Sequence, residues 1–294
     1  MEIRTFHVEY LAQFVNSYLI QTDHYNVFID TSLKHNEEEY VPYLSDNREN
    51  IVLLTHGHWD HIGCNSLMKK NGARIYASKA DLPWLTDFQL HWDIGFGQFL
   101  DDVTIPPARW DVFWSEIGET TEMDGFIQDG DELTFDDTVI RVIALPGHSA
   151  GSIGFYLPAD DVMFTGDALM ETGFFGGLAQ YYDAGAYRSS MQKLIQLNPK
   201  TVYTAHTPEY FDHKAAEAAE TAIRFSHSIE KDVLEFVHST DEDIRIGDAA
   251  RYVCGKEGKK VGGGACITVL NHLAHNTDPD VVGRLHLEKY HCGI

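Results

Sequence analysis

The sequence predicts an α+β fold in which β-sheets are covered by helices. The chain has 294 residues, of which 44% are hydrophobic and 23% charged, the ordinary composition of a globular protein with a sizeable core. Short apolar runs typical of buried strands alternate with segments of helical period in both halves of the chain. Several of these runs end in segments that contain Gly together with His or Asp.

The first half is expected to begin with strands. The first three form an opening β-meander and span residues 3–9, 16–21 and 25–30. The apolar run at 51–54 predicts a buried strand. Residues 62–70 predict a helix whose N-terminus directs partial positive charge toward the segment before it, and residues 74–77 predict another strand.

The second half repeats this alternation. Three apolar runs, each followed by a candidate site residue, span 139–145, 161–164 and 201–204. An amphipathic helix is predicted at 184–197, and a long helix at 213–238, where Ala, Phe and Ile recur near helical period. Further helices are predicted around 246–253 and at 265–274, and a strand at 281–288.

The candidate site residues follow these apolar runs. The segment after the run at 51–54 places three histidines and one aspartate within six positions, and each of the three later runs adds one residue. The full set is His56, His58, Asp60, His61, His148, Asp167 and His206. Five histidines and two carboxylates on strand-exit segments suit a pair of divalent ions of borderline softness.

This set resembles the metallo-β-lactamase superfamily, whose pattern is His-x-His-x-Asp-His followed by a distant His, Asp and His. The resemblance covers roughly residues 3–211 and implies a four-layer αβ/βα sandwich with metals at one edge of the two sheets. It implies two metals, one held by His56, His58 and His148, the other by Asp60, His61 and His206, with Asp167 bridging them. Redox diiron branches usually carry Glu at the position of His58, so the hydrolytic, zinc-type branch is favoured. The metal-site Cys frequent in class B lactamases is missing, because no Cys lies between Cys64 and Cys254.

The resemblance implies a dinuclear metal-dependent hydrolase, with zinc as the expected metal and iron or manganese as alternatives. A bridging hydroxide would cleave a small ester, lactone or thioester, and Asp60 would accept its proton and pass it to the leaving group. Three alternatives stay open: a phosphodiesterase or ribonuclease, a mononuclear-iron persulfide dioxygenase, and a non-catalytic metal-binding protein.

Residues beside the ligands are candidates for orienting them. Asp30 ends an expected strand, and Thr55, Ser149 and Thr207 each flank a ligand; turn roles explain these residues equally well. The glycines before His148 and Asp167 are expected to provide the tight backbone that turns both side chains inward.

Residues 81–126 form an aromatic insertion between two expected strands. They carry nine Phe and Trp residues, including four of the five tryptophans of the chain. So aromatic a segment must pack on the body of the protein, on a second subunit or over the site. If it is a lid, Trp84 and Trp92 contribute to substrate binding. Candidates outside the insertion are Phe174 and Phe175, in the segment after Asp167, and Tyr182 and Tyr210, which could form a hydrogen bond with a lactone or ester carbonyl.

Domain organisation follows from the resemblance. Residues 1–212 are expected to form the catalytic domain and residues 213–294 a helical C-terminal region. The helix, helix, strand order of this region is similar to the small winged-helix-like tail of some metallo-β-lactamase-fold hydrolases.

Charge and cysteine content limit the partners. A net charge of −23 argues against nucleic acid, since a nucleic-acid binder needs a basic footprint. No run of about 18 apolar residues predicts a membrane span, and the N-terminus lacks a signal-peptide pattern. Four scattered cysteines predict free thiols in the cytoplasm. The expected partner is a small-molecule substrate, and a homo-oligomer remains open.

Overall fold

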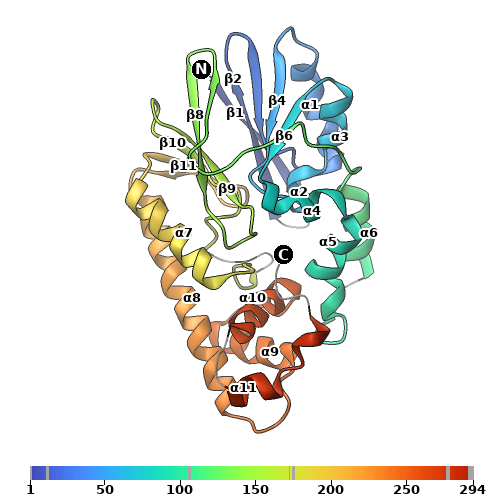
Figure 1. Cartoon of the computed structure of the whole chain (residues 1–294), viewed down its shortest axis with the longest axis vertical. Coiled ribbons are helices and arrows are strands. Elements are labelled where there is room, and N and C mark those ends of the chain that lie inside the picture. The colour runs from blue at the N-terminus through green and yellow to red at the C-terminus, as the bar shows by residue number, and fades with distance from the viewer. Residues whose placement is uncertain are drawn as a thin grey trace.

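A computed structural model describes residues 2–10, 13–104, 107–171, 173, 176–275 and 279–290. Its strands form two six-stranded sheets, which lie in the upper half of Figure 1, above the last helices of the chain. The first has the order β1-β2-β3-β4-β5-β6 and the second the order β12-β11-β10-β9-β8-β7. Both sheets are mixed, and the predicted α+β class is confirmed.

The first sheet begins with the predicted meander. Strands β1 to β3 pair antiparallel, whereas β3 to β6 pair parallel. Its strands are β1 (Glu2–Tyr10), β2 (Gln13–Gln21), β3 (Tyr25–Ile29), β4 (Glu49–Leu53), β5 (Arg74–Ala77) and β6 (Gly125–Phe126). In β3 and β4 nearly every side chain is buried, because both faces of this sheet are covered. This explains why these strands read as unbroken apolar runs.

The second sheet carries the later candidate residues. Its strands are β7 (Glu132–Phe135), β8 (Thr138–Ala144), β9 (Ile153–Leu157), β10 (Val162–Phe164), β11 (Thr201–Tyr203) and β12 (Tyr210–Phe211). All neighbours pair antiparallel except β10 and β11, which are parallel. The carboxyl ends of β10 and β11 therefore lie at the same edge of the sheet.

Helices cover the outer face of each sheet, which gives the predicted four-layer sandwich. Between the sheets, residues such as Ile29 and Leu53 meet Phe155 and Phe164 in one cluster. Helices α1 (Glu37–Leu44) and α3 (Asn65–Lys70) share a cluster with the outer face of the first sheet. Helices α7 (Ala184–Leu197) and α8 (Lys214–His238) share another cluster with the outer face of the second sheet. Figure 1 shows the two helical layers on opposite sides of the sheets.

The helix predicted at 62–70 is wrong as a single element. The chain forms α2 (Trp59–Ile62) and then α3, with Gly63 and Cys64 between them. The first helix ends because two backbone groups near its end form hydrogen bonds outside the helix. The His61 carbonyl accepts from the Thr31 N–H at 2.8 Å, and the Gly63 N–H donates to the Ser32 carbonyl at 2.7 Å. Asp60 and His61 consequently lie in a short helix and not in a loop.

The aromatic insertion folds into short helices that pack on the body of the protein. They are η2 (Lys79–Asp81), α4 (Leu82–Thr86), α5 (Phe88–Gly95), η3 (Gly97–Phe99) and α6 (Pro107–Glu116). Trp92 and Phe113 join the cluster outside the first sheet, whereas Phe99 joins the core of the C-terminal helices. The insertion thus connects the sandwich with the C-terminal region.

The C-terminal region is helical. Helices α9 (Ile246–Glu257), α10 (Gly263–Ala274), α11 (Pro279–Arg284) and the short η5 (Leu287–Lys289) follow α8. The strand predicted at 281–288 is wrong, because most of this segment is helical, in α11 and η5, and its buried side chains Val281 and Leu285 pack into the core of the C-terminal helices. One isolated bridge, Ile244 to Leu285, is the only pairing there among the described residues, so the expected winged-helix strand is not formed. None of the helices in the described part of the chain is both long and apolar enough to cross a membrane.

Candidate metal centre and active site

All seven candidate ligands lie beyond the carboxyl ends of strands. His56 and His58 lie between β4 and α2, and Asp60 and His61 lie in α2. His148, Asp167 and His206 follow β8, β10 and β11. Although these residues come from distant parts of the sequence, the two sheets bring their ends to one place. All seven are buried or nearly so.

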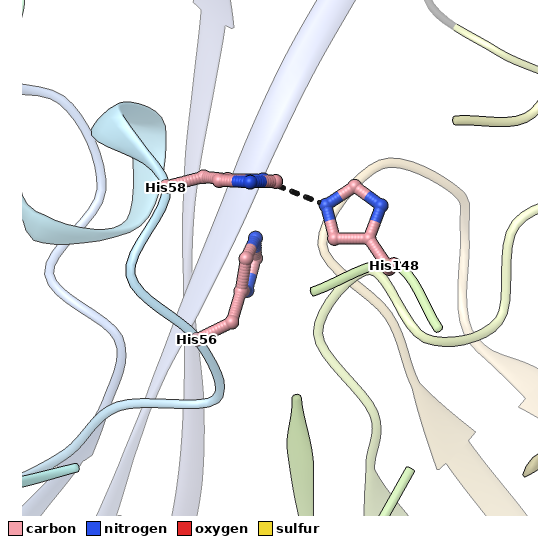
Figure 2. Close-up of side chains that lie close together, drawn as sticks. All are labelled: His56, His58 and His148. Carbon is pink, nitrogen blue, oxygen red and sulfur yellow. Dashed lines mark hydrogen bonds between the residues drawn. The ribbon is translucent and has the colours of Figure 1, made fainter. Parts of the chain in front are cut away.

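Three histidines form the first group. Figure 2 shows His56 and His58 on one side and His148 reaching them from the other. The His58 Nδ1 and His148 Nε2 atoms are 2.8 Å apart, and the ring of His56 lies 4.6 Å from that of His58 and 4.8 Å from that of His148. Two ring nitrogens this close either share a proton or face a common cation.

A second group lies beside the first, and Asp167 touches both. Asp60, His61 and His206 offer ligand atoms that all lie within 4.8 Å of one another. Asp167 Oδ1 is 3.4 Å from His61 Nε2 and 3.2 Å from His206 Nε2, and its Oδ2 is 3.4 Å from His148 Nε2. Asp167 therefore lies between the two groups, as a bridging ligand would.

The donor set fits divalent cations. The Nε2 atoms of His56 and His58 are buried and form no hydrogen bond with any residue that the structure describes. A buried polar atom left unpaired costs about 1–3 kcal/mol, and two such atoms beside one another indicate a site for a cation. Imidazole and carboxylate are ligands that zinc, iron and manganese accept.

Surrounding groups hold the ring orientation of several ligands. The Asp30 carboxylate lies 2.8 Å from His61 Nδ1, and it accepts hydrogen bonds from the Thr55 N–H and hydroxyl, both at 2.7 Å. The Thr55 hydroxyl also lies 3.1 Å from His56 Nδ1. Asp30 and Thr55, both considered from the sequence, thus contact ligands directly. Backbone carbonyls hold two others: that of Gln180 lies 2.8 Å from His148 Nδ1, and that of Phe14 the same distance from His206 Nδ1.

Two glycines allow the ligand segments to approach this closely. Gly147 has φ +134° and Gly166 φ +52°, and a side chain at either position would collide with its neighbour. A Cβ at Gly147 would lie 2.4 Å from the backbone of Tyr187, and one at Gly166 would lie 2.3 Å from the Thr55 hydroxyl. The expected tight backbone before His148 and Asp167 is therefore present.

A buried carboxylate that the sequence analysis missed connects two ligand segments. Asp81 accepts hydrogen bonds from the Gly57 N–H at 2.9 Å, the Ser149 hydroxyl at 2.7 Å and the Gly151 N–H at 2.7 Å. Gly57 lies between the ligands His56 and His58, and Ser149 follows His148. In the sequence, Asp81 was only one acidic residue of the insertion, with no pattern to single it out.

The charges of the second group are balanced by protons in the metal-free protein. Burial disfavours protonation of His206, but the neighbouring Asp167 and Asp60 outweigh it and raise the pKa of this histidine to about 10. At His61, too, the neighbouring carboxylates outweigh burial and raise the pKa. Burial and the adjacent histidines lower the pKa of His56 and His58 well below the usual value, so both rings are neutral. Neutral imidazole is the form that binds metal ions.

A cavity of about 320 Å³ opens onto this cluster and reaches His58, Asp60, Asp167 and His206. Its walls come mainly from five parts of the chain: the β1–β2 hairpin, the segment around α2, the insertion, residues 177–182, and the residues before and within α10. Apolar side chains predominate, among them Phe14, Val15, Leu33, Trp59, Phe96 and Leu178. Such a mixture of apolar walls and a few converging polar groups is typical of a small-molecule site.

The substrate-binding candidates divide into four groups. Tyr182 lines the cavity. Trp84 does not line it but packs behind the metal cluster, with its ring 4.9 Å from that of His58, and Trp92 is buried in the core next to Phe113. Tyr210 borders a different surface hollow, where its hydroxyl donates to Glu171 at 2.8 Å. Phe174 and Phe175 lie outside the described residues.

Two parts of the cavity wall were not predicted. His91 of α5 lines it from the insertion, and residues 260–265 line it from the C-terminal region. Lys260 is the one lysine or arginine among the lining residues that the structure describes. Gly263, the first residue of α10, allows close approach: a Cβ there would lie 3.2 Å from the Gly95 carbonyl.

Comparison with known proteins agrees with this geometry. The family model "Metallo-beta-lactamase superfamily" matches residues 11–206, which contain all seven clustered residues. The chain belongs to this superfamily. It is 35% identical to an uncharacterized protein of Mycobacterium leprae over 168 residues, which cover 54% of this chain and 70% of the relative. It is 30% identical to the hydroxyacylglutathione hydrolase GloC of Haemophilus influenzae over 166 residues, covering 54% and 69% of the two chains.

The fold comparison extends over nearly the whole molecule. A crystal structure of a metallo-beta-lactamase family protein from Thermus thermophilus superimposes with a TM-score of 0.73, covers 92% of this chain and 91% of the other, and is 21% identical. At that identity the likeness shows the fold alone. Together with the clustered ligands, the family match identifies the chain as an enzyme, a metal-dependent hydrolase of this superfamily.

Proposed function

We propose that this enzyme holds two divalent metal ions, with zinc as the expected metal, and hydrolyses a small ester, lactone or thioester. The cavity that ends on the metal cluster carries this proposal, because its volume of about 320 Å³ and its apolar walls fit a small organic molecule. His56, His58 and His148 would hold one ion, and Asp60, His61 and His206 the other, with Asp167 between them. When bound, such ions activate a water molecule and polarise a carbonyl oxygen.

The side chains of this protein then supply the remaining chemistry. Asp60 borders the cavity, and its Oδ2 lies 3.4 Å from His206 Nε2. The neighbouring histidines outweigh burial and lower the pKa of Asp60, so its carboxylate is ionised at neutral pH. An ionised carboxylate at the end of the cavity can accept a proton from the attacking water and deliver it to the leaving oxygen or sulfur.

Tyr182 supports binding of a carbonyl compound. Its ring lies 6.0 Å from that of His58 and 5.5 Å from that of Trp84. Burial raises the pKa of the Tyr182 phenol, so the hydroxyl keeps its proton and can donate a hydrogen bond. The amide of Gln180, 3.4 Å from the hydroxyl oxygen, helps to hold it in place. The tyrosine can thus position the substrate oxygen near the metals.

The surroundings of the site favour small neutral or cationic substrates over nucleic acid. The protein carries a net charge of −23, and the acidic residues of the insertion, among them Asp93 and Asp102, greatly outnumber its one basic residue. A polyanion would be repelled by this field. We therefore propose a small-molecule substrate and no nucleic-acid partner. A cytoplasmic location is also proposed, in keeping with the free thiols of Cys64, Cys254 and Cys266.

A metal and substrate survey tests this proposal. Metal analysis of the purified protein should give about two ions per chain, and the loaded enzyme should hydrolyse members of a panel of short esters, lactones and thioesters. A chelator should abolish this activity and added metal should restore it, while RNA should not compete. Cleavage of RNA or a phosphodiester without any ester hydrolysis would contradict the proposal. One iron per chain with oxygen uptake in the presence of a persulfide would indicate the dioxygenase alternative instead.

A further inference from the structure

His91 has an unusual environment for a histidine outside the metal cluster. It lies in α5, is 2% exposed, and lines the cavity that ends on the metal ligands. Its ring packs edge-on against Trp84 at 4.8 Å and against Phe113 at 5.3 Å. Its Nδ1 atom is buried and forms no hydrogen bond with any residue in the described part of the chain.

An unpaired polar atom in an apolar wall needs an explanation. An apolar side chain between these two aromatic rings would leave no nitrogen unpaired, whereas one buried unpaired nitrogen costs about tenfold or more in the folding equilibrium. The ring is also close to the reacting centre, since its centroid lies 5.6 Å from that of His58. A substrate bound at the metals would therefore have atoms close to the His91 ring.

We propose that His91 is a substrate-binding residue that forms a hydrogen bond with a hydroxyl or amide group beside the scissile carbonyl. This inference rests on the proposed function, because it places the substrate in the same cavity. A neutral imidazole has one N–H and one lone pair, and a hydroxyl can match either of them. Substrates that carry such a polar group on the acyl side should be preferred over those with a plain alkyl chain.

The aromatic insertion gains a specific role from this proposal. Trp84 and Phe113 fix the imidazole plane, and Phe96, which directly follows α5, supplies apolar wall to the same cavity. The insertion would then select the substrate by one hydrogen bond within an apolar surface. Losing a hydrogen bond that a site is built to form with its substrate typically lowers the specificity constant more than losing a methylene contact.

Matched substrates test the proposal with the metal-loaded full-length enzyme. We would measure kcat/KM for S-butanoyl-N-acetylcysteamine and for its 2-hydroxy and 3-hydroxy derivatives, and compare their ratios between variants. In the wild type at least one hydroxylated substrate should be preferred by about tenfold or more. His91→Phe should bring the ratio of kcat/KM between the hydroxylated and the plain substrate close to one. His91→Gln, which keeps a polar group, should retain part of the preference. If His91→Phe does not fold, the comparison is made with His91→Gln and His91→Ala.

A neighbouring variant controls for altered packing. Trp92→Phe loosens the packing of the insertion on Phe96, Trp110 and Phe113 but keeps the rings that hold the His91 imidazole, so it should lower Tm while keeping the wild-type ratio. A wild-type ratio near one, or an unchanged ratio in His91→Phe, would overturn the proposal. Calorimetric binding of butanoate and 3-hydroxybutanoate separates this proposal from the proposed function. If no thioester is hydrolysed but 3-hydroxybutanoate still binds more tightly in a His91-dependent manner, the proposed function fails and the His91 proposal holds.

Discussion

The Ser149 hydroxyl donates a 2.7 Å hydrogen bond to the buried carboxylate of Asp81. This contact joins the turn that carries His148 to the start of the aromatic insertion. The same carboxylate accepts the N–H of Gly57, which lies between two ligands of the first sheet. One side chain therefore connects the candidate ligand segments of both sheets, and the insertion takes part in building the candidate metal centre.

Asp81→Asn should weaken both folding and metal binding. An amide nitrogen cannot accept a hydrogen bond, so at least one of the three donors around Asp81 loses its acceptor, at a cost of about 1–3 kcal/mol. Because these donors flank His58 and His148, the first metal should also bind more weakly. Chemical denaturation of the metal-free protein and titration with zinc measure the two effects separately.

Asp87→Asn provides a control for Asp81→Asn. Asp87 lies in the same insertion and caps α5 by accepting the Leu90 N–H at 2.9 Å, but it contacts no ligand segment. Its replacement by another good capping residue should change stability by less than about 1 kcal/mol and leave zinc affinity as it is. Equal losses of zinc affinity in both variants would show that Asp81 has no specific link to the metal centre.

Asp60→Asn tests whether this residue transfers a proton. The substitution preserves shape, so both metals can remain, but the amide cannot take up a proton as a carboxylate does. We expect kcat to fall by roughly 10² or more, with metal content near the wild-type value. A variant with both metals and an unchanged kcat would show that Asp60 acts only as a ligand.

Metal binding should release protons, and metal affinity should rise with pH. The pKa of His206 is raised to about 10 and that of His61 is also raised, so both are protonated in the metal-free protein near pH 7 and must lose these protons to bind a metal. Calorimetric titrations in buffers of different ionisation enthalpy measure the release. Binding heats that do not depend on the buffer would contradict this expectation.

The same shifts make the stability of the metal-free protein depend on pH. A histidine whose folded pKa is above its unfolded value of about 6.5 stabilises the fold fully below that pH. The contribution is lost as pH rises toward about 10, the folded pKa of His206. Tm of the metal-free protein should therefore fall across this range, whereas the metal-loaded protein should show a flatter profile.

The seven residues that cluster in the structure could be singled out from the sequence because its signals are local. Each candidate ligand follows an apolar run, and residues at strand ends converge whenever the strands share a sheet edge, as those before Asp167 and His206 do. Asp81 and His91 gave no local signal, since their importance comes from contacts across the fold. The predicted strand at 281–288 was wrong for a related reason. Its few apolar residues fit both the strand period and the helix period, and packing against α9 and α10 favours the helix.

Two tryptophans of the insertion allow its roles to be separated. Both are buried, Trp84 to 2% and Trp92 to 4% exposure, so replacing either with Ala should cost about 3–5 kcal/mol of stability. Only Trp84 contacts the site, through His58, His91 and Tyr182. Trp92 instead packs on Phe96, Trp110 and Phe113.

We therefore expect Trp84→Ala to lower kcat/KM for a hydrophobic ester or lactone by about tenfold, in line with one lost aromatic contact. Trp92→Ala should lower Tm to a similar degree with a much smaller change in kinetics, since its ring lies outside the cavity wall. Steady-state kinetics well below either Tm, with metal content determined on the same samples, makes the comparison. If both variants keep wild-type kinetics and instead dissociate an oligomer, as light scattering would show, the insertion is a subunit contact and does not shape the active site.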